Sequence, residues 1–285
     1  MGKNIPKTTS PHLAPDRRKQ PDFFIADIFD ASIKDDMASM EHPLFALRAG
    51  DKRVRVYERT GVTVTIKPGY DGCATIHDKD LWIYCISQLV EAKNRGREIS
   101  PTVHFTMYDF LRTTNRRTDG DSYERAASML GRLKGTVIET DIRTAGQRDR
   151  RGFGLIDSWR VIERDSDERM IAVEVDLPHW LFRSVSAMQV LTLSPDYFRL
   201  RKPLDRRVYE LARKHCGHQP TWKVGISTLH EKSGSTDKRF KFRAAMKLLA
   251  EADALPDYRM IFDTEADTLT FRQRENKAVR KGATA

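Results

Sequence analysis

One order of secondary-structure elements occurs twice along the chain, and this repetition restricts the possible folds more than any other feature. In each half the pattern of apolar residues predicts a helix, a short strand, a short helix, a longer helix and a β-hairpin. The first set spans residues 77–162 and the second spans residues 200–273. A winged helix, which is a helix-turn-helix unit followed by a hairpin, has this order. The sequence therefore predicts an α+β chain with two winged helices in tandem.

The two longer helices also share a register. Four apolar residues of the first helix recur in the second, each displaced by 119 positions: Tyr123, Ala126, Ala127 and Leu130 become Phe242, Ala245, Met246 and Leu249. Four matches at helical spacing can arise by chance in a single helix. A shared register together with a shared order of elements indicates a structural duplication.

The boundaries of the expected domains follow from this pattern. We expect an N-terminal arm (residues 1–40), an N-terminal winged-helix domain (41–193), a C-terminal winged-helix domain (194–272) and a basic, disordered tail (273–285). The arm is expected to be flexible, and residues 22–45 combine six acidic side chains with interleaved Phe, Ile and Met. Such a segment either folds against a partner or packs Phe23, Phe24, Ile28 and Phe29 on its own domain.

The charge of the chain indicates its partner class. The net charge is +10 with a pI near 9.5, and nucleic acid is the commonest partner of a protein this basic. The longest apolar run, residues 81–90, is too short to span a bilayer, so we expect no membrane partner. The N-terminal segment has no apolar signal sequence, and three unevenly placed cysteines cannot all pair. Both observations favour a cytoplasmic protein.

In a helix-turn-helix unit the second helix lies in the major groove of double-stranded DNA. In the first domain this helix is expected over residues 122–134, with a capping box at Asp121 and Glu124. Its polar face and the preceding loop supply six candidate DNA contacts: Arg116, Arg117, Ser122, Arg125, Ser128 and Arg132. The wing is expected to pair residues 136–143 with 152–162, and its cationic tip adds Arg148, Arg150 and Arg151, beside Arg143. Such a wing suits contact with the DNA backbone.

The second domain offers a comparable set of candidates. Its contacts are expected at Arg206, Arg207, Ser235, Thr236, Lys238, Arg239, Arg243 and Lys247. Ser235 and Thr236 are placed at the start of the long helix, where backbone N–H groups can hold a phosphate. Arginine in this region can bind guanine O6 and N7 with two hydrogen bonds. The tip of the second hairpin, residues 263–267, is acidic and should stay away from phosphate. For any one of these cationic ridges, a solvated helix face is the competing interpretation.

Catalytic and metal-binding interpretations find little support. His77, Asp78 and Asp80 could form a metal or acid–base cluster, but they directly precede an apolar helix, where Asp serves as a cap or dipole partner. His215, Cys216 and His218 could suggest a metal, but a helix end closed by Gly217 explains them better. No phosphate-binding loop, nucleophile elbow or zinc-protease motif is present. We expect a protein that is not an enzyme and needs neither cofactor nor metal.

Six segments resemble one known family. They are residues 42–47, 57–66, 74–89, 108–116, 151–159 and 191–217, the last reading LTLSPDYFRLRKPLDRRVYELARKHCG. They are similar to the plasmid replication initiator protein A family of broad-host-range bacterial plasmids, and the resemblance covers roughly residues 42–260. More distantly, residues 200–211 resemble the inter-domain segment of iteron-binding plasmid initiators, which also use paired winged helices.

The resemblance implies a protein of the bacterial cytoplasm that initiates plasmid replication. It would bind repeated sites at the origin as a monomer or a homodimer, promote local melting and recruit host replication proteins such as an initiator, helicase or clamp. Residues 194–217 would link the two domains, with a buried thread of Leu200, Leu204, Val208 and Leu211. The alternative is a winged-helix transcriptional repressor, of its own gene or of others, without initiator activity. A strand-cleaving initiator or a primase would need catalytic clusters that the sequence lacks.

Overall fold

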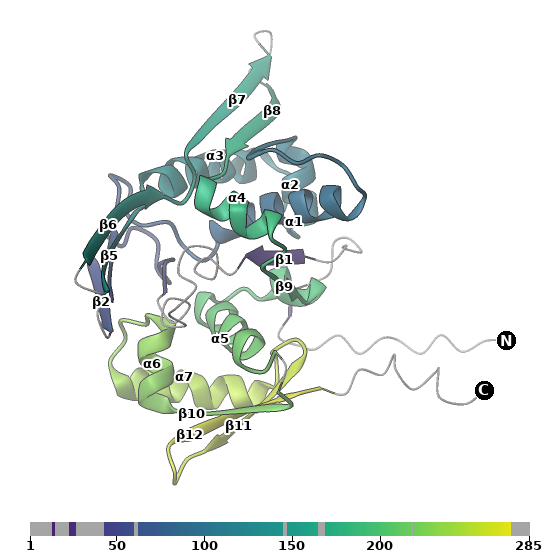
Figure 1. Cartoon of the computed structure of the whole chain (residues 1–285). Helices are drawn as coiled ribbons and strands as arrows, with labels where there is room; N and C mark the ends of the chain where they lie inside the picture. The colour runs from purple at the N-terminus through teal and green to yellow at the C-terminus, as the bar shows by residue number, and fades with distance from the viewer. Residues whose placement is uncertain are drawn as a thin grey trace, which may run out of the picture. The chain divides into compact units, whose positions relative to one another are not determined.

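The computed structural model describes residues 13–14, 23–26, 43–59, 62–144, 147–164, 169–217 and 219–274. The chain separates into two compact units, and the division falls between Phe198 and Arg199. We call them the N-terminal unit and the C-terminal unit, and Figure 1 labels their elements. The expected boundary lay five residues earlier, at 193/194. The difference is the short 3₁₀ helix η2 (Pro195–Arg199), in which Tyr197 and Phe198 are buried.

Six elements of the N-terminal unit follow the expected order. They are α1 (Lys79–Asn94), β4 (Thr102–Phe105), α2 (Met107–Thr113), α3 (Gly120–Gly135), β7 (Ser158–Arg164) and β8 (Arg169–Asp176). The three strands form an antiparallel sheet in the order β4-β8-β7. Helix α1 is buried from Lys79 to Val90 except at Gln88, as a helix that is apolar on most sides must be. The β7–β8 hairpin projects away from the helices (Figure 1).

A second antiparallel sheet in this unit has the order β2-β3-β5-β6. Its strands are β2 (Arg55–Arg59), β3 (Val62–Lys67), β5 (Val137–Thr144) and β6 (Gln147–Gly154). On β3, Val62, Val64 and Ile66 are buried while the residues between them are partly exposed, the alternation of a sheet with one covered face. Strands β2 and β3 pair with each other as an antiparallel hairpin.

The expected wing of the first domain is wrong. Residues 136–162 were taken as one hairpin, but they contribute to two sheets: β5–β6 extends the four-stranded sheet, and β7 pairs with β8. The reason is the segment between β6 and β7. Leu155 and Ile156 are buried, and the indole N–H of Trp82 on α1 donates to the Leu155 carbonyl at 2.9 Å. Anchoring this segment on α1 ends β6 and starts a new strand.

Part of the N-terminal arm is ordered. Strand β1 (Phe23–Ala26) pairs antiparallel with β9 (Val190–Leu193), and it lies beside α1 and α4 (His179–Ser186). The expectation of a flexible arm is therefore wrong for these four residues, because the backbone pairs within its own unit. Ile28, Phe29 and the rest of the acidic-apolar block up to residue 42 lie outside the described residues.

The C-terminal unit repeats the order and the sheet topology of the six elements. They are α5 (Pro203–His215), β10 (Thr221–Gly225), α6 (Ile226–Ser233), α7 (Arg239–Ala252), β11 (Tyr258–Asp263) and β12 (Thr268–Gln273). The sheet order is β10-β12-β11, so in both units the last-but-one strand is at the edge and the last strand is central. Pro203 occupies the first turn of α5, where its missing N–H leaves no bond unmade.

Details of this unit correct two expectations and bear out a third. In the buried thread of α5, Leu200, Val208 and Leu211 are buried, but Leu204 is only half-buried. Helix α5 ends at His215 with Cys216 as its C-cap, and the N–H of Gly217 directly after the cap donates to the Lys214 carbonyl at 3.4 Å, so the expected helix end at Gly217 is confirmed. The tail expected from residue 273 starts later, because Gln273 belongs to β12 and Arg274 forms an ion pair with Asp253 at 2.7 Å. Residues 275–285 lie outside the described part.

The shared register of the two long helices is visible in their packing. All eight residues related by the displacement of 119 positions are buried or half-buried. Among the described residues no helix combines the length and apolar character needed to cross a membrane.

Candidate nucleic-acid interface

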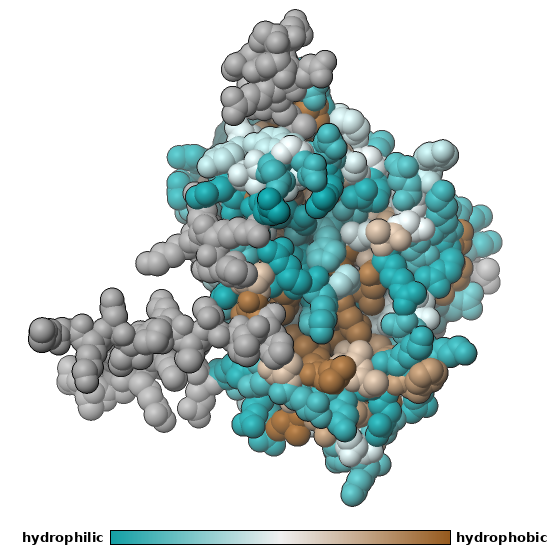
Figure 2. All heavy atoms as spheres, turned by 180° about the vertical axis from the view of Figure 1, so that it is seen from behind, coloured by the Kyte–Doolittle hydropathy of each residue, from teal (hydrophilic) through white to brown (hydrophobic). Residues whose placement is uncertain are grey.

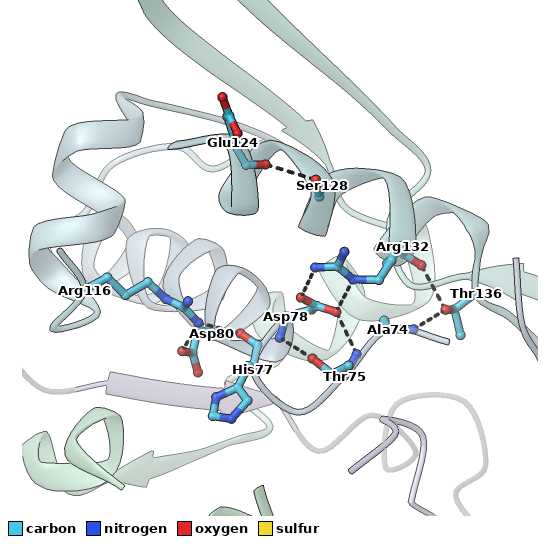
Figure 3. Close-up of polar contacts among 10 residues, drawn as sticks. All are labelled: Ala74, Thr75, His77, Asp78, Asp80, Arg116, Glu124, Ser128, Arg132 and Thr136. Carbon is cyan, nitrogen blue, oxygen red and sulfur yellow. Dashed lines mark hydrogen bonds and ion pairs between the residues drawn. The ribbon is translucent and has the colours of Figure 1, made fainter. Parts of the chain in front are cut away.

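An aspartate in the polar segment before α1 binds Arg132, one of the arginines that the sequence predicts to contact DNA. Asp78 is buried, and its carboxylate accepts hydrogen bonds from Nε and Nη2 of Arg132 on α3, both at 2.8 Å (Figure 3). It also accepts from the Thr75 backbone N–H at 2.7 Å. The bonds from Asp78 raise the pKa of the Arg132 guanidinium, whose side chain is 22% exposed. Arg132 thus points toward Asp78 at the start of α1 and not toward the solvent, so it is not available for contact with DNA.

A second ion pair, between Arg116 and the buried Asp80, excludes Arg116 from the candidate DNA contacts in the same way. Asp80 is fully buried and lies 2.6 Å from Arg116 Nη2, which also donates to the His77 carbonyl at 2.8 Å (Figure 3). The Arg116 guanidinium lies 5.8 Å from the centre of the Phe110 ring. This pair ties the start of α1 to the loop between α2 and α3, so both arginines hold elements of the N-terminal unit together.

The two pairs also give His77, Asp78 and Asp80 a structural role. Asp78 is the N-cap residue of α1 but makes no side-chain capping bond, so its expected role as a helix cap is wrong. Its carboxylate is directed to Arg132 instead, because a buried carboxylate needs a charged partner. Within the described residues no three His, Cys, Asp or Glu side chains gather as a metal site would require.

Helix α3 exposes Arg125 and Ser128 as expected, but its start and its cap differ from the expectation. The helix begins at Gly120, and Asp119 is the N-cap, accepting from Ser122 N–H at 3.1 Å, so the capping box expected at Asp121 is wrong. Ser122 is half-buried by this role. Ser128 is exposed and donates to the Glu124 carbonyl at 3.0 Å, and both lie on the side of α3 away from Asp78 (Figure 3). Glu124, which the sequence reasoning missed, adds an acid to this face.

Two arginines remain available beside this face. The side chains of Arg117 and Arg125 are each 74% exposed. Arg117 pairs with Asp119 at 2.8 Å, and Arg125 approaches Asp121 at 3.4 Å. Exposed pairs of this kind are worth about 1 kcal/mol or less, so a phosphate or a base can replace the carboxylate. Arg117, Arg125 and Ser128 are therefore the contacts that α3 and its loop can offer.

The β5–β6 hairpin carries the expected cluster of cations. Arg148 pairs with Asp141 and Arg151 pairs with Asp149, at 2.5 and 2.6 Å. Arg150 is exposed, and no hydrogen bond or ion pair is found for it among the described residues. Arg143 stands opposite Arg148 in the ladder. This hairpin remains a candidate for contact with the DNA backbone.

The cationic face expected on α5 is largely internal. Arg206 is 2% exposed, and its Nε donates to the Leu200 carbonyl at 2.7 Å. Arg207 donates to the Lys232 carbonyl from Nε and Nη2, at 3.2 and 2.7 Å, and lies 3.5 Å from Glu210. These bonds join α5 to the C-terminus of α6. The expectation that Arg206 and Arg207 reach phosphate is wrong, because both side chains are largely buried and their guanidinium groups bond to backbone carbonyls of their own unit.

Two arginines of α7 are bonded to the acidic turn between β11 and β12, which the sequence predicts to stay away from phosphate. Asp267, between β11 and β12, lies 2.9 Å from Arg239 Nη2 and 2.8 Å from Arg243 Nε. Arg243 also donates to the Thr264 carbonyl at 3.0 Å, and its guanidinium lies 5.1 Å from the Phe262 ring centre. Bonding to Arg243, and then to Arg239, lowers the pKa of Asp267. Both arginines therefore lie on the flank of α7 that faces the hairpin.

The loop before α7 and the outward face of this helix also differ from what the sequence predicts. Ser235 and Thr236 do not begin the helix, which starts at Arg239 after the N-cap Lys238. Ser235 Oγ instead accepts from the Asp237 N–H at 3.3 Å. Lys238 and Lys247 are exposed as expected. The sequence reasoning missed that the side opposite the core carries apolar residues, although their four-residue spacing was visible: Phe240, Ala244 and Leu248.

Comparison with known proteins now identifies the family. The model of the family "Replication initiator protein A" matches residues 34–260. The chain belongs to this family. A protein of Wigglesworthia glossinidia brevipalpis named "Putative replication protein" is 42% identical over 261 residues, which cover 90% of this chain and 95% of that protein. The resemblance noted in the sequence is confirmed, and the chain is a replication initiator.

Solved structures show that the fold of this initiator occurs elsewhere. Two crystal structures of domains 2 and 3 of RctB superpose with TM-scores of 0.58 and 0.62. They cover 83% and 87% of this chain and 96% and 98% of their own chains. Sequence identity is 10% in both, so the likeness concerns the fold alone.

Proposed function

We propose that this initiator binds repeated double-stranded DNA sites at a plasmid origin, with its two six-element sets acting as tandem winged helices. Bound there, it promotes local melting and recruits host replication proteins in the bacterial cytoplasm. The supporting observation is the repetition of one topology. In both sets α3 and α7 occupy the position of the recognition helix, and both sheets have the same strand order. The excess of basic residues supplies the attraction to phosphate.

The distribution of charge refines where the DNA backbone is contacted. In this proposal β7–β8 and β11–β12 are the wings, and the sequence between the two strands of each is acidic, with Asp165, Asp167 and Glu168 in one and residues 263–267 in the other. Neither sequence suits contact with phosphate. The β5–β6 hairpin carries the exposed Arg150 and two arginines in exposed pairs, so we assign backbone contact in the N-terminal unit to this hairpin.

We further propose that the protein has no catalytic activity of its own and acts by binding. The side chains that most resembled an acid–base cluster are engaged with Arg132 and Arg116. Melting and loading would then follow from the energy of binding several repeats and from the host proteins recruited. A homodimer and a contact through the N-terminal acidic-apolar block belong to this proposal as possible routes of recruitment.

Complementation and footprinting test the proposal together. A plasmid carrying only the origin is introduced into a host with or without the gene supplied separately, and replication is scored by recovery of the plasmid. We expect recovery only with the gene, and a footprint over direct repeats in the origin. Protection of one inverted repeat over a promoter, without plasmid recovery, would identify the repressor alternative instead.

A further inference from the structure

The outward face of α7 is apolar although it is exposed. Phe240 and Leu248 are 65% and 62% exposed, and Ala244 between them is exposed as well. Residues spaced by four lie along one side of a helix, so these three form a continuous row, which we call the α7 row. The opposite side, with Phe242, Met246 and Leu249, is buried in the core. A solvated helix face would normally be polar, so the row is suited to a contact.

The surroundings of the α7 row indicate what covers it. Lys238 and Lys241 flank the row at its N-terminal end and Lys247 lies beside Leu248, and all three are exposed. The nearest acid of the same face is Glu251, at the far end of the helix and 3.9 Å from Lys247. Figure 2 shows hydrophobic side chains among hydrophilic ones where Figure 1 places the C-terminal unit. An apolar row framed by cations is complementary to a surface that combines apolar groups with negative charge.

The major groove of DNA is such a surface. Its base edges carry a single kind of apolar group, the C5-methyl of thymine, and phosphates border the groove on both sides. Guanine readout, the expected task of this helix, needs a free guanidinium fork. Arg243 directs Nε to Asp267 and Nη2 to the Thr264 carbonyl, so its fork is occupied. Arg239 lies on the same flank of α7 and pairs with the same Asp267 at 2.9 Å, so the outward side of the helix is left to the residues of the row.

We propose that α7 reads thymine, with Phe240 and Ala244 packing on C5-methyl groups in the major groove while the flanking lysines bind the phosphates. This inference rests on the proposed DNA-binding function and names the base that the C-terminal unit recognises. Leu248, further along the helix, packs against the sugar–phosphate edge or a further methyl group. Arg239 and Arg243 serve to hold α7 on the hairpin.

Replacing thymine with uracil tests this directly, because uracil pairs as thymine does but lacks the methyl group. Origin fragments and random fragments of equal length are amplified with either dTTP or dUTP, and their affinities are measured by fluorescence anisotropy. Burial of one methyl group is worth about fourfold in affinity, so with two contacts we expect wild-type protein to bind thymine-containing origin DNA roughly fifteenfold more tightly than the uracil form. On random DNA the two forms should bind equally.

Variants locate the effect on the helix. F240S removes one of the two methyl contacts and should reduce the thymine-to-uracil ratio to about a quarter of its wild-type value, whereas F240Y, which keeps the ring, should preserve it. Y70S is the matched control, because Tyr70 is 92% exposed and lies in the N-terminal unit, so its ratio should equal that of wild type. K241Q should weaken binding to both DNA forms alike.

The outcomes separate the inference from the function beneath it. Specific binding with no difference between thymine and uracil overturns the reading of methyl groups and leaves origin binding intact. A wild-type ratio that F240S does not change overturns the assignment to α7. If F240S leaves the ratio unchanged but alters the mass measured by light scattering, the row is a protein interface. Failure of wild-type protein to prefer origin DNA over random DNA refutes the proposed function itself.

Discussion

Helices α3 and α7 occupy the same place in the two units, but they place their arginines differently. Arg132 of α3 points inward to the buried Asp78, and Arg116 in the preceding loop points to the buried Asp80. In α7, Arg239 and Arg243 lie at the surface and share the partly exposed Asp267 of the neighbouring turn. Arginines at and near two corresponding helices thus form an internal brace in one unit, with Asp78 and Asp80, and a surface clamp in the other, with Asp267.

This difference also changes the face that each helix presents to a ligand. The outward side of α3 is small and polar, with Ser128 between Glu124 and Arg125 on the exposed surface. The outward side of α7 is the apolar row of Phe240, Ala244 and Leu248. Two copies of one topology can therefore read different features of one DNA site, since topology places a helix while its outward residues determine what it recognises.

The largest difference between the units should appear in stability. R132A leaves the carboxylate of Asp78 buried without its partner, which should lower the free energy of unfolding by about 3–5 kcal/mol. R243A removes an exposed partner and should cost about 1 kcal/mol or less. Urea denaturation followed by circular dichroism measures both. Equal, small losses would show that the pair with Asp78 is no brace and would return Arg132 to the candidates for DNA contact.

The next effect concerns sequence-specific binding. R125A removes an exposed guanidinium beside the outward face of α3 and should cost about 1–3 kcal/mol on origin repeats but much less on random DNA. R243A should cost less on the same repeats, because Asp267 and the Thr264 carbonyl already occupy its guanidinium. R160A is the control, since this exposed arginine of β7 pairs with Glu174 at 2.6 Å. A larger loss for R243A than for R125A would show that Arg243, and not Arg125, contacts the bases.

A smaller and uniform effect should come from the hairpin that only the N-terminal unit possesses. R150A should weaken binding to specific and random DNA alike and lower the salt slope of log K by about one for one lost phosphate contact. R151A should do less, because Asp149 pairs with Arg151 at 2.6 Å in the free protein. Titrations at several salt concentrations measure both slopes. An unchanged slope for R150A would remove β5–β6 from the interface.

The smallest effect is the pH dependence of the stability that the ion pairs of Asp267 with Arg239 and Arg243 contribute. Arg243 and Arg239 lower the pKa of Asp267 from its ordinary value of 3.8. A lowered pKa stabilises the fold above the ordinary value, and this stability is lost as the pH falls through the folded-state pKa. The difference in unfolding free energy between wild type and D267N should therefore be full at pH 6 and should vanish at pH values below the lowered pKa. A difference that persists there would mean that Asp267 acts without its charge.

Much of the fold was predictable because its signals are local. The apolar spacing of α3 and α7, the short strands and the second hairpin all follow from periods of 3.6 and 2 residues. The errors lie where a distant group overrides a local pattern. Leu155 was placed within a strand, but the Trp82 indole, 73 positions away, binds its carbonyl and divides the segment between two sheets.

The candidate site, like the fold, was predictable from the sequence only in part. The sequence by itself determined that the chain is basic, carries two sets of one topology and belongs among the initiators that residues 191–217 resemble. Only the tertiary structure decided which arginines remain available. Asp78 and Arg132 are 54 positions apart, and Arg243 and Asp267 are 24 apart, so no periodic pattern links them. A charge's role depends on the partner that folding brings within hydrogen-bonding distance and on whether water still reaches the pair.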